Sequence, residues 1–299
     1  MRKLQNIPSG RPLGLLMAGT GMFLVSSDSL FIRIAQPSSG WTIAFMAGVW
    51  SIPVVFVAAW RTYGSQLFSE IKKHLKVLCF TGLLASFSTT AFTVSVTLTS
   101  VSNVVAILAS APILAAFFAR LTIREYTSPR TWRSIFITGV GVLIIVGGSM
   151  SGGGIGGDLL ALAGISGYAF NLTIWRRYPD LPRILVVLAA AIFIVVVTSI
   201  PASPSTIDRD AFLATLAMGA SFGPLARFLL ASSTRYAPAA EVSLFTPIET
   251  VCASIWAWLF FSEVPANATV IGAIVIVSAV TYGITGPASE VAPELEPHP

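Results

Sequence analysis

The sequence predicts an all-α membrane protein with ten transmembrane helices, arranged as two five-helix halves of opposite orientation. Three observations predict this fold: the apolar composition, the distribution of positive charges, and a stretch that recurs in the second half of the chain. Of the 299 residues 55% are hydrophobic and 10% are charged, whereas soluble domains average about 25% charged residues. Little of the chain is therefore left for a soluble domain.

Apolar windows of spanning length follow one another along the chain. A hydrocarbon core about 30 Å thick needs roughly 20 apolar residues in a helix that rises 1.5 Å per residue. Strings such as ILVVLAAAIFIVVV are apolar on every side, as a lipid-embedded helix requires. The predicted spans are 13–34, 41–60, 75–97, 101–121, 131–149, 157–176, 183–200, 210–233, 238–261 and 266–285.

The positive charges predict the orientation. Ten spans place both termini on one side of the membrane. With the N-terminus in the cytoplasm, 16 of the 18 Lys and Arg residues fall at cytoplasmic ends or loops, and only Arg33 and Arg209 fall outside. A miscount by one span would remove this bias, so it also supports the count. The net charge of +5 then reflects topology, and no nucleic-acid partner is expected.

Some short features indicate no chemistry. Two histidines, one of them His298 near the C-terminus, cannot assemble a His-based metal site, and no cofactor is expected. The Gly run at 152–157 lacks the GK[ST] of a phosphate loop and is interpreted as a linker between the halves. Cys79 and Cys252 lie inside predicted spans and are expected to be reduced packing residues. The acidic, Pro-rich tail, 286–299, is predicted to be disordered.

The two halves share residues in register. APILAAFFARLTIREYTSPRTW at 111–132 has a counterpart in TPIETVCASIWAWLFFSEVPANATV at 246–270, and a shift of 138 places Glu125 on Glu263. Because five is odd, the second half must enter the membrane upside down, which is a recurring architecture of secondary transporters. At a shift of 143, Gly14, Gly21, Asp28 and Arg33 fall on Gly157, Gly164, Asn171 and Arg176.

These stretches resemble the drug/metabolite transporter superfamily, specifically its EamA-type members with two five-helix repeats. The resemblance rests on SNVVAILASAPILAAFFARLTIREYTSPRTW, GDLLALAGISGYAFNLTIWRRY and PIETVCASIWAWLFFSEVPANATVIGA. It divides the chain into repeats at 13–149 and 157–285. One departure is that Thr250 stands opposite Pro112 at the shift of 138. The resemblance implies a multi-pass transporter, often an exporter of amino acids or related metabolites in bacterial inner membranes, with a central cavity between the repeats.

Two glutamates close predicted spans at the water interface. Glu125 ends the fourth span and Glu263 ends the ninth, at opposite faces of the membrane. Both are expected to organise helix ends and turns rather than to take part in transport.

Three charged residues lie deep within predicted spans, away from the span ends, where a charge costs roughly 2.5–3.5 kcal/mol to insert, and are therefore candidate site residues. Glu249 is near the midplane of the ninth span, Asp28 is in the outer half of the first, and Arg227 follows Gly223 and Pro224 in the eighth. The Gly-Pro pair is expected to free backbone carbonyls toward a cavity. The alternatives are that Glu249 is a buried structural carboxylate and that Arg227 reaches the interface.

Uncharged polar residues form two weaker candidate sets, each on one helix face. The first could face a wet cavity or hold helices together. The second could line the cavity, or its helix could pack closely through Gly164 and Gly167 with the aromatic side chains toward the lipid headgroups. The first set is Ser86, Thr90, Thr93 and Thr97, and the second is Tyr168, Asn171 and Trp175.

Together these residues suit a small-molecule substrate carried across the lipid bilayer. Acids and aromatic faces suit an amine, and Arg227 suits a carboxylate on the same ligand, which favours a zwitterion or an amphipathic amine. A deep carboxylate, Glu249 or Asp28, is expected to exchange protons as the cavity alternates between sides. Uncoupled diffusion through the carrier remains an alternative, as does an intramembrane enzyme that uses the deep carboxylates. The oligomeric state is expected to be a monomer or a homodimer.

Overall fold

The computed structural model describes residues 10–99, 101–146, 154–286 and 290–291. The described chain is almost entirely helical, with one antiparallel pair of two-residue strands, β1 (Glu125–Tyr126) and β2 (Glu290–Val291). Residues 152–153 of the Gly run and most of the acidic tail lie outside the described residues. Residues 155–157, expected to be linker, form the first turn of α7, and residues 290–291 of the tail, expected to be disordered, form β2. The helices are α1 (Arg11–Ile34), α2 (Gly40–Tyr63), η1 (Gly64–Gln66), α3 (Leu67–Leu98), α4 (Val101–Leu108), α5 (Ala111–Ile123), α6 (Pro129–Val146), α7 (Ile155–Arg177), α8 (Arg183–Thr198), η2 (Pro204–Thr206), α9 (Arg209–Ala217), η3 (Met218–Phe222), α10 (Gly223–Ser233), α11 (Ala239–Ser243), α12 (Thr246–Phe261) and α13 (Asn267–Ile284).

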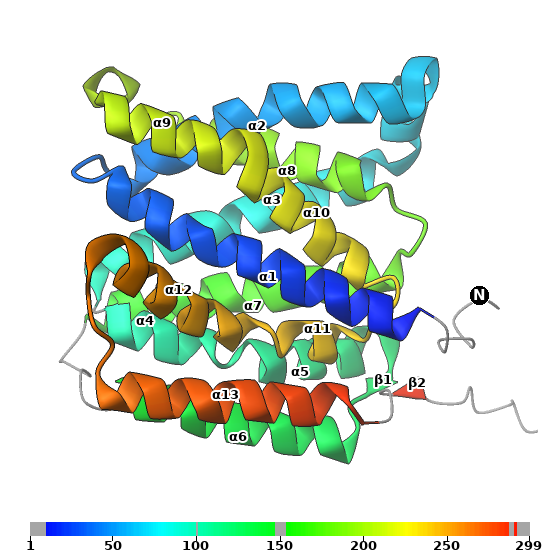
Figure 1. Ribbon diagram of the computed structural model, residues 1–299. Coiled ribbons are helices and arrows are strands. Elements are labelled where there is room, and N and C mark those ends of the chain that lie inside the picture. Colours follow the sequence, from blue (N-terminus) through cyan, green and yellow to red (C-terminus); the bar gives the residue numbers. More distant parts are fainter. Residues whose placement is uncertain (1–9, 100, 147–153, 287–289, 292–299) are drawn as a thin grey trace, which may run out of the picture.

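Helix length and composition confirm an all-α, multi-pass membrane protein. Among the described residues, eight helical segments are long and apolar enough to cross a membrane, and one of them, residues 40–95, joins α2 to α3. The apolar helix α8 has 16 residues and is shorter. The start of α1 and the end of α13 lie at the same end of the molecule (Figure 1). The count of ten spans and the cytoplasmic placement of the termini stay predictions.

Two predicted spans are interrupted midway. The fourth is divided between α4 and α5, and the ninth between α11 and α12. Pro112 and Pro247 each stand in the first turn of the second segment, where the fixed φ and missing N–H of proline are tolerated. Pro247, rather than Thr250, is thus the structural counterpart of Pro112, because α12 has 16 residues against 13 in α5 and the extra turn lies at its start.

The helices form two corresponding groups in the centre of the molecule. In one group α1 packs along α10 and α12, and in the other α7 packs along α3 and α5. The helices α6 and α13 pack together on one side of these groups, and α2 packs on α8 (Figure 1). Each group combines helices from both halves of the sequence, as expected for intertwined repeats.

Glycines at matching positions of the two halves make corresponding contacts. A Cβ added to Gly21 would stand 3.1 Å from the carbonyl oxygen of Ala226, and one added to Gly164 would stand 3.2 Å from the carbonyl oxygen of Ser88. A shift of 138 places Ser88 on Ala226. Small residues at these positions let helix backbones approach closely, and the same approach occurs in both halves.

The two helices that end before Glu125 and Glu263 are closed in the same way. Arg124 ends α5 with φ 53° and Ser262 ends α12 with φ 57°. A left-handed residue commonly terminates a helix, but it is usually glycine. The same left-handed ending without glycine in both halves gives the two glutamates equivalent positions after the helix.

Candidate functional site

Three of the predicted charged residues meet inside the structure, and we refer to Asp28, Arg227 and Glu249 as the charged cluster. Nη2 of Arg227 lies 3.5 Å from Oδ2 of Asp28, and their side chains are 31% and 13% exposed. Glu249 is close enough to interact electrostatically with both. Asp28 lies on α1, Arg227 on α10 and Glu249 on α12, so helices from both halves build the cluster.

Glu249 is placed by the interruption of the ninth span. It lies in the first turn of α12, where the positive end of the helix dipole favours a carboxylate. Glu249, Cys252 and Trp256 follow at spacings of three and four, so they share one helix face. This face is turned toward α1, because Nε1 of Trp256 donates to Oγ of Ser26 at 2.9 Å.

Arg227 is placed by an irregular turn in the eighth span. The π-helix η3 ends directly before Gly223, and π-turns recur at functional sites. A Cβ added to Gly223 would stand 2.8 Å from Nη1 of Arg227 and 2.6 Å from the carbonyl oxygen of Met218. Because Gly223 has no side chain, there is space beside it for the guanidinium of Arg227. One carbonyl of the π-turn, that of Gly219, accepts from Oγ of Ser51 at 2.8 Å.

Tyr168 brings the second group of helices to the charged cluster. From α7 it interacts with Thr246, at the start of α12, and with Glu249. Within the described residues, Oδ1 of Asp28 is buried and has no hydrogen-bond partner, and the buried hydroxyls of Tyr168 and Thr246 lie near each other without the geometry of a hydrogen bond. Buried polar atoms are nearly always paired, so this region calls for water or a polar ligand group.

The polar stripe on α3 has mixed surroundings. Oγ of Ser86 and Oγ1 of Thr90 are buried and unpaired within the described part of the chain, whereas Thr93 donates to the carbonyl of Thr89 at 2.9 Å. The side chain of Thr97 lies outside the described part. A role for this stripe in the pathway stays a prediction.

Asn171 and Trp175 contact α3 and are not brought to the charged cluster. Nδ2 of Asn171 donates to the carbonyl of Thr81 at 3.2 Å, and Nε1 of Trp175 donates to Oγ1 of the same threonine at 3.0 Å. Both residues are buried. These bonds hold α7 against α3, and the buried Trp175 does not face the lipid headgroups, which was the alternative for this face. A pathway role for the pair stays a prediction.

The two helix-end glutamates lie at opposite ends of the molecule, away from the charged cluster. Glu125 is buried, and its Oε2 lies 3.4 Å from Nε of Arg176. Glu263 is exposed, and its Oε2 accepts from Nη1 of Arg33 at 2.8 Å. In the sequence, Arg33 and Arg176 are also counterparts.

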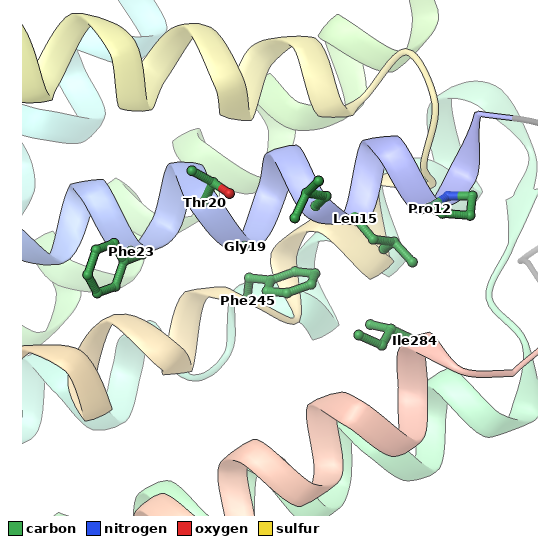
Figure 2. Close-up of a pocket in the computed structure, with 8 residues that line it drawn as sticks. Pro12, Leu15, Gly19, Thr20, Phe23, Phe245 and Ile284 are labelled. Atoms are coloured by element: carbon green, nitrogen blue, oxygen red, sulfur yellow. The ribbon is translucent and has the colours of Figure 1, made fainter.

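A groove on the surface has different chemistry from the charged cluster. It has a volume of about 540 Å³ and lies between α1 and the end of α13, beside the interruption of the ninth span (Figure 2). Phe245 stands at this interruption, next to Gly19. The lining suits hydrocarbon and does not include the charged cluster, and it consists of Pro12, Leu15, Leu16, Gly19, Thr20, Phe23, Phe245 and Ile284.

Sequence reasoning missed the interruptions and the residues beside them. Thr246 and Ser26 belong to the surroundings of the charged cluster, yet neither was singled out. The available signal was Pro112 with Pro247, a proline midway along the fourth and the ninth span, since paired interruptions in the two halves mark binding sites in transporters. In the described ranges, no group of three or more His, Cys, Asp or Glu residues could hold a metal ion.

The fold and the buried charges define a multi-pass helical membrane protein with a polar centre. The EamA-like transporter family model matches residues 12–147 and 155–285. The chain therefore belongs to the EamA-like transporter family, whose members are membrane transporters and not enzymes. As a member it is a multi-pass membrane protein of the lipid bilayer that binds small molecules.

A solved crystal structure has the same fold. It superposes with a TM-score of 0.80 at 16% sequence identity and covers 91% of this chain and 97% of its own. At this identity the likeness shows the fold alone. No curated protein matches the sequence.

Proposed function

We propose that the protein is a secondary transporter that exports small metabolites, amino acids or amphipathic amines, by alternating access. The single observation that carries the proposal is the charged cluster at the interruption of the ninth span, with Tyr168 from the other helix group beside it. Interrupted helices near the midplane are a common position for substrate sites in transporters. The cell membrane of a bacterium, and a monomer or homodimer, are parts of the same proposal.

The balance of charge supports a substrate with an ammonium group. Arg227 is adjacent to Asp28, so one carboxylate, that of Glu249, has no cation of its own within the cluster. An ammonium group would supply that charge, and Tyr168 would add an aromatic face. A carboxylate on the same molecule would fit Arg227 only in place of Asp28, so an amphipathic amine is the better match by charge and a zwitterion is the second.

The buried carboxylates support proton coupling. A carboxylate between two helix groups can be ionised when the cavity is wet and neutral when it is closed. Glu249, in the first turn of α12, is the residue we propose for this exchange, with Asp28 as the second candidate. Neutralising Glu249 by Gln should abolish transport driven by a pH gradient in proteoliposomes and leave folding intact.

A thermal-shift screen tests substrate binding directly. The purified protein is heated with amino acids, aromatic amines, quaternary cations and nucleotide sugars. A ligand at about 100 times its Kd should add roughly 2.7 kcal/mol of stability. The stabilisation should disappear in Glu249→Gln and Arg227→Ala and persist in Glu70→Gln, where the glutamate lies on α3 near Lys73 and His74.

The screen and the transport assay separate the parts of the proposal. If a zwitterion that stabilises the wild type stabilises Glu249→Gln equally, the charged cluster is not its binding site. Full gradient-driven transport by Glu249→Gln would remove this residue from proton exchange. A ligand that is bound but chemically converted, detected by mass spectrometry, would replace transport with catalysis.

A further inference from the structure

Two arginines occupy corresponding positions at opposite ends of the molecule. Arg33 lies in the last turn of α1 and Arg176 in the last turn of α7. Each pairs with the glutamate that follows the neighbouring interrupted span, Glu263 after α12 and Glu125 after α5. We name the two ends of the molecule the Glu263 end and the β1 end.

Arg176 also binds backbone carbonyls. Its Nη1 donates to the carbonyls of Thr234 and Arg235 at 3.2 Å each. These two residues follow α10 and lead into α11. In the described part of the chain, the hydrogen bonds of the Arg33 guanidinium go to Glu263, and its face lies 4.2 Å from the ring centroid of Phe261.

The carbonyl bonds of Arg176 join the two groups of helices. The connection that carries Thr234 belongs to the α1 group, since Nε of Arg11 at the start of α1 lies 2.8 Å from Glu241 of α11. Arg176 itself belongs to the α7 group. At the β1 end, a buried guanidinium therefore holds the α1 group against the α7 group, and α11 packs on both α5 and α7 there.

The Glu263 end is packed more loosely. The repeat relation pairs α4 with α11 and α12 with α5, yet α4 contacts α12 far less than α11 contacts α5. The Arg33 and Glu263 side chains are 43% and 52% exposed, compared with 3% and 2% for Arg176 and Glu125. The two ends of one pseudosymmetric molecule are thus in different states.

The repeat relation identifies what Arg33 would bind if the Glu263 end closed. A shift of 138 places Thr234 and Arg235 on Val96 and Thr97, at the end of α3. Glycine contacts support this correspondence. A Cβ added to Gly14 would stand 3.0 Å from the backbone nitrogen of Ala237, and one added to Gly157 would stand 2.9 Å from that of Thr99, which the same shift places on Ala237.

We propose that Arg176 and Arg33 are alternating clamps: Arg176 closes the β1 end in the present structure, and Arg33 closes the Glu263 end by binding the backbone carbonyls of Val96 and Thr97. The glutamates hold each guanidinium in position. The inference rests on the proposed alternating access. It adds the two arginines as positioning residues for that motion and assigns them opposite effects.

Accessibility of a central cysteine tests the clamps without any substrate. Thr246→Cys is made in a Cys79→Ser, Cys252→Ala background, because Thr246 is buried beside Tyr168. A membrane-impermeant maleimide is added to one side of sealed vesicles at a time. Arg176→Gln should raise the labelling rate from the β1 side by about tenfold, a typical conformational coupling.

The matched variant should act in the opposite direction. Arg33→Gln should lower labelling from the β1 side and keep the position accessible from the Glu263 side. Arg61→Gln, on the exposed end of α2, is the surface control and should change neither rate. Arg176→Lys keeps the charge with fewer donors and should be intermediate, which provides a second test if Arg176→Gln does not fold.

The outcomes separate the clamps from the transport proposal. Equal changes in Arg33→Gln and Arg176→Gln, or no change in either folded variant, would overturn the clamps. Clamps that respond as expected while the thermal-shift screen finds no ligand would instead count against the proposed substrate class. If a ligand binds but the arginine variants do not change the labelling rates, the transporter proposal stands and the clamp proposal is wrong.

Discussion

Arg227 and Asp28 form an ion pair between α10 and α1, with 3.5 Å between Nη2 and Oδ2, and Glu249 interacts with both. If the ion pair served only to hold α1 and α10 together, a second carboxylate beside it would have no role. The surplus negative charge and the unpaired hydroxyls of Tyr168 and Thr246, within the described residues, support the proposed cation site in this region.

Removing the guanidinium should destabilise the protein as well as abolish binding. Arg227→Ala leaves the mostly buried carboxylate of Asp28 without its partner, and an unpaired buried polar group costs about 1–3 kcal/mol. The free energy of unfolding should fall by that order in a denaturant titration. Arg227→Gln combined with Asp28→Asn should recover most of the stability but none of the ligand-induced thermal shift. Recovery of both would show that the pair is structural only.

Gly223 should be as important as Arg227 for binding. A Cβ on Gly223 would crowd both the guanidinium of Arg227 and the backbone oxygen of Met218, and the backbone has the smaller freedom to move. Gly223→Ala should therefore displace the guanidinium and weaken ligand binding by at least the factor of about ten that 1.4 kcal/mol represents. Gly139→Ala is the matched control, because a Cβ there meets nothing within 4 Å. Equal binding by the two variants would contradict the placement of Arg227.

The sequence was sufficient to predict the helical class and to single out Asp28, Arg227 and Glu249 as candidates, because each prediction rests on a strong local cost. A long apolar run has few alternatives to a spanning helix, and a charge in such a run needs a partner or a function. That the three residues meet was not predicted, because the sequence does not give the distance between residues on different helices. The direction in which a polar helix face points is not set by the local sequence. Asn171 and Trp175 have the spacing of a cavity wall, but both bond to Thr81 of α3. Helix rotation depends on neighbours that a single segment does not specify.

The hydrogen bonds of Arg176 at the helix ends could not be predicted from the sequence, for a related reason. The correspondence of Arg33 with Arg176 is visible in the sequence, and both glutamates were expected at helix ends. However, the carbonyls that Arg176 binds are backbone atoms of Thr234 and Arg235, so no residue type marks them. Their position depends on how the two helix groups meet.

The exposed pair at the Glu263 end should follow a simple acid titration. Hydrogen bonds from Arg33 lower the pKa of Glu263 below its ordinary value of 4.5. A lowered pKa gives stability that is present above the ordinary value and is lost as the pH falls through the lowered one. The difference in Tm between the wild type and Glu263→Gln should stay constant down to about pH 4.5 and shrink below it. A difference that shrinks already near neutral pH would contradict the pairing. Because the pair is exposed, the whole effect should be small.

The buried pair at the β1 end should behave differently, because its two members are not equivalent. Burial raises the pKa of Glu125, and the nearby Glu241 adds to this, while Arg176 lowers it. The raised pKa means that the closed end tolerates a neutral side chain at this position. The contribution of Glu125 to the stability of the closed end is therefore fully present at low pH and is lost as the pH rises through the raised pKa.

Glu125→Gln, which keeps the shape and removes the charge, should then open the β1 end much less than Arg176→Gln, which removes both carbonyl bonds. In the maleimide assay, the labelling rate of Glu125→Gln from the β1 side should approach that of the wild type as the pH is lowered, whereas Arg176→Gln should stay fast throughout. Normalising each rate to a cysteine at an exposed position corrects for the reactivity of the thiol. If Glu125→Gln opened the end as far as Arg176→Gln, the ion pair rather than the carbonyl bonds would hold the β1 end closed.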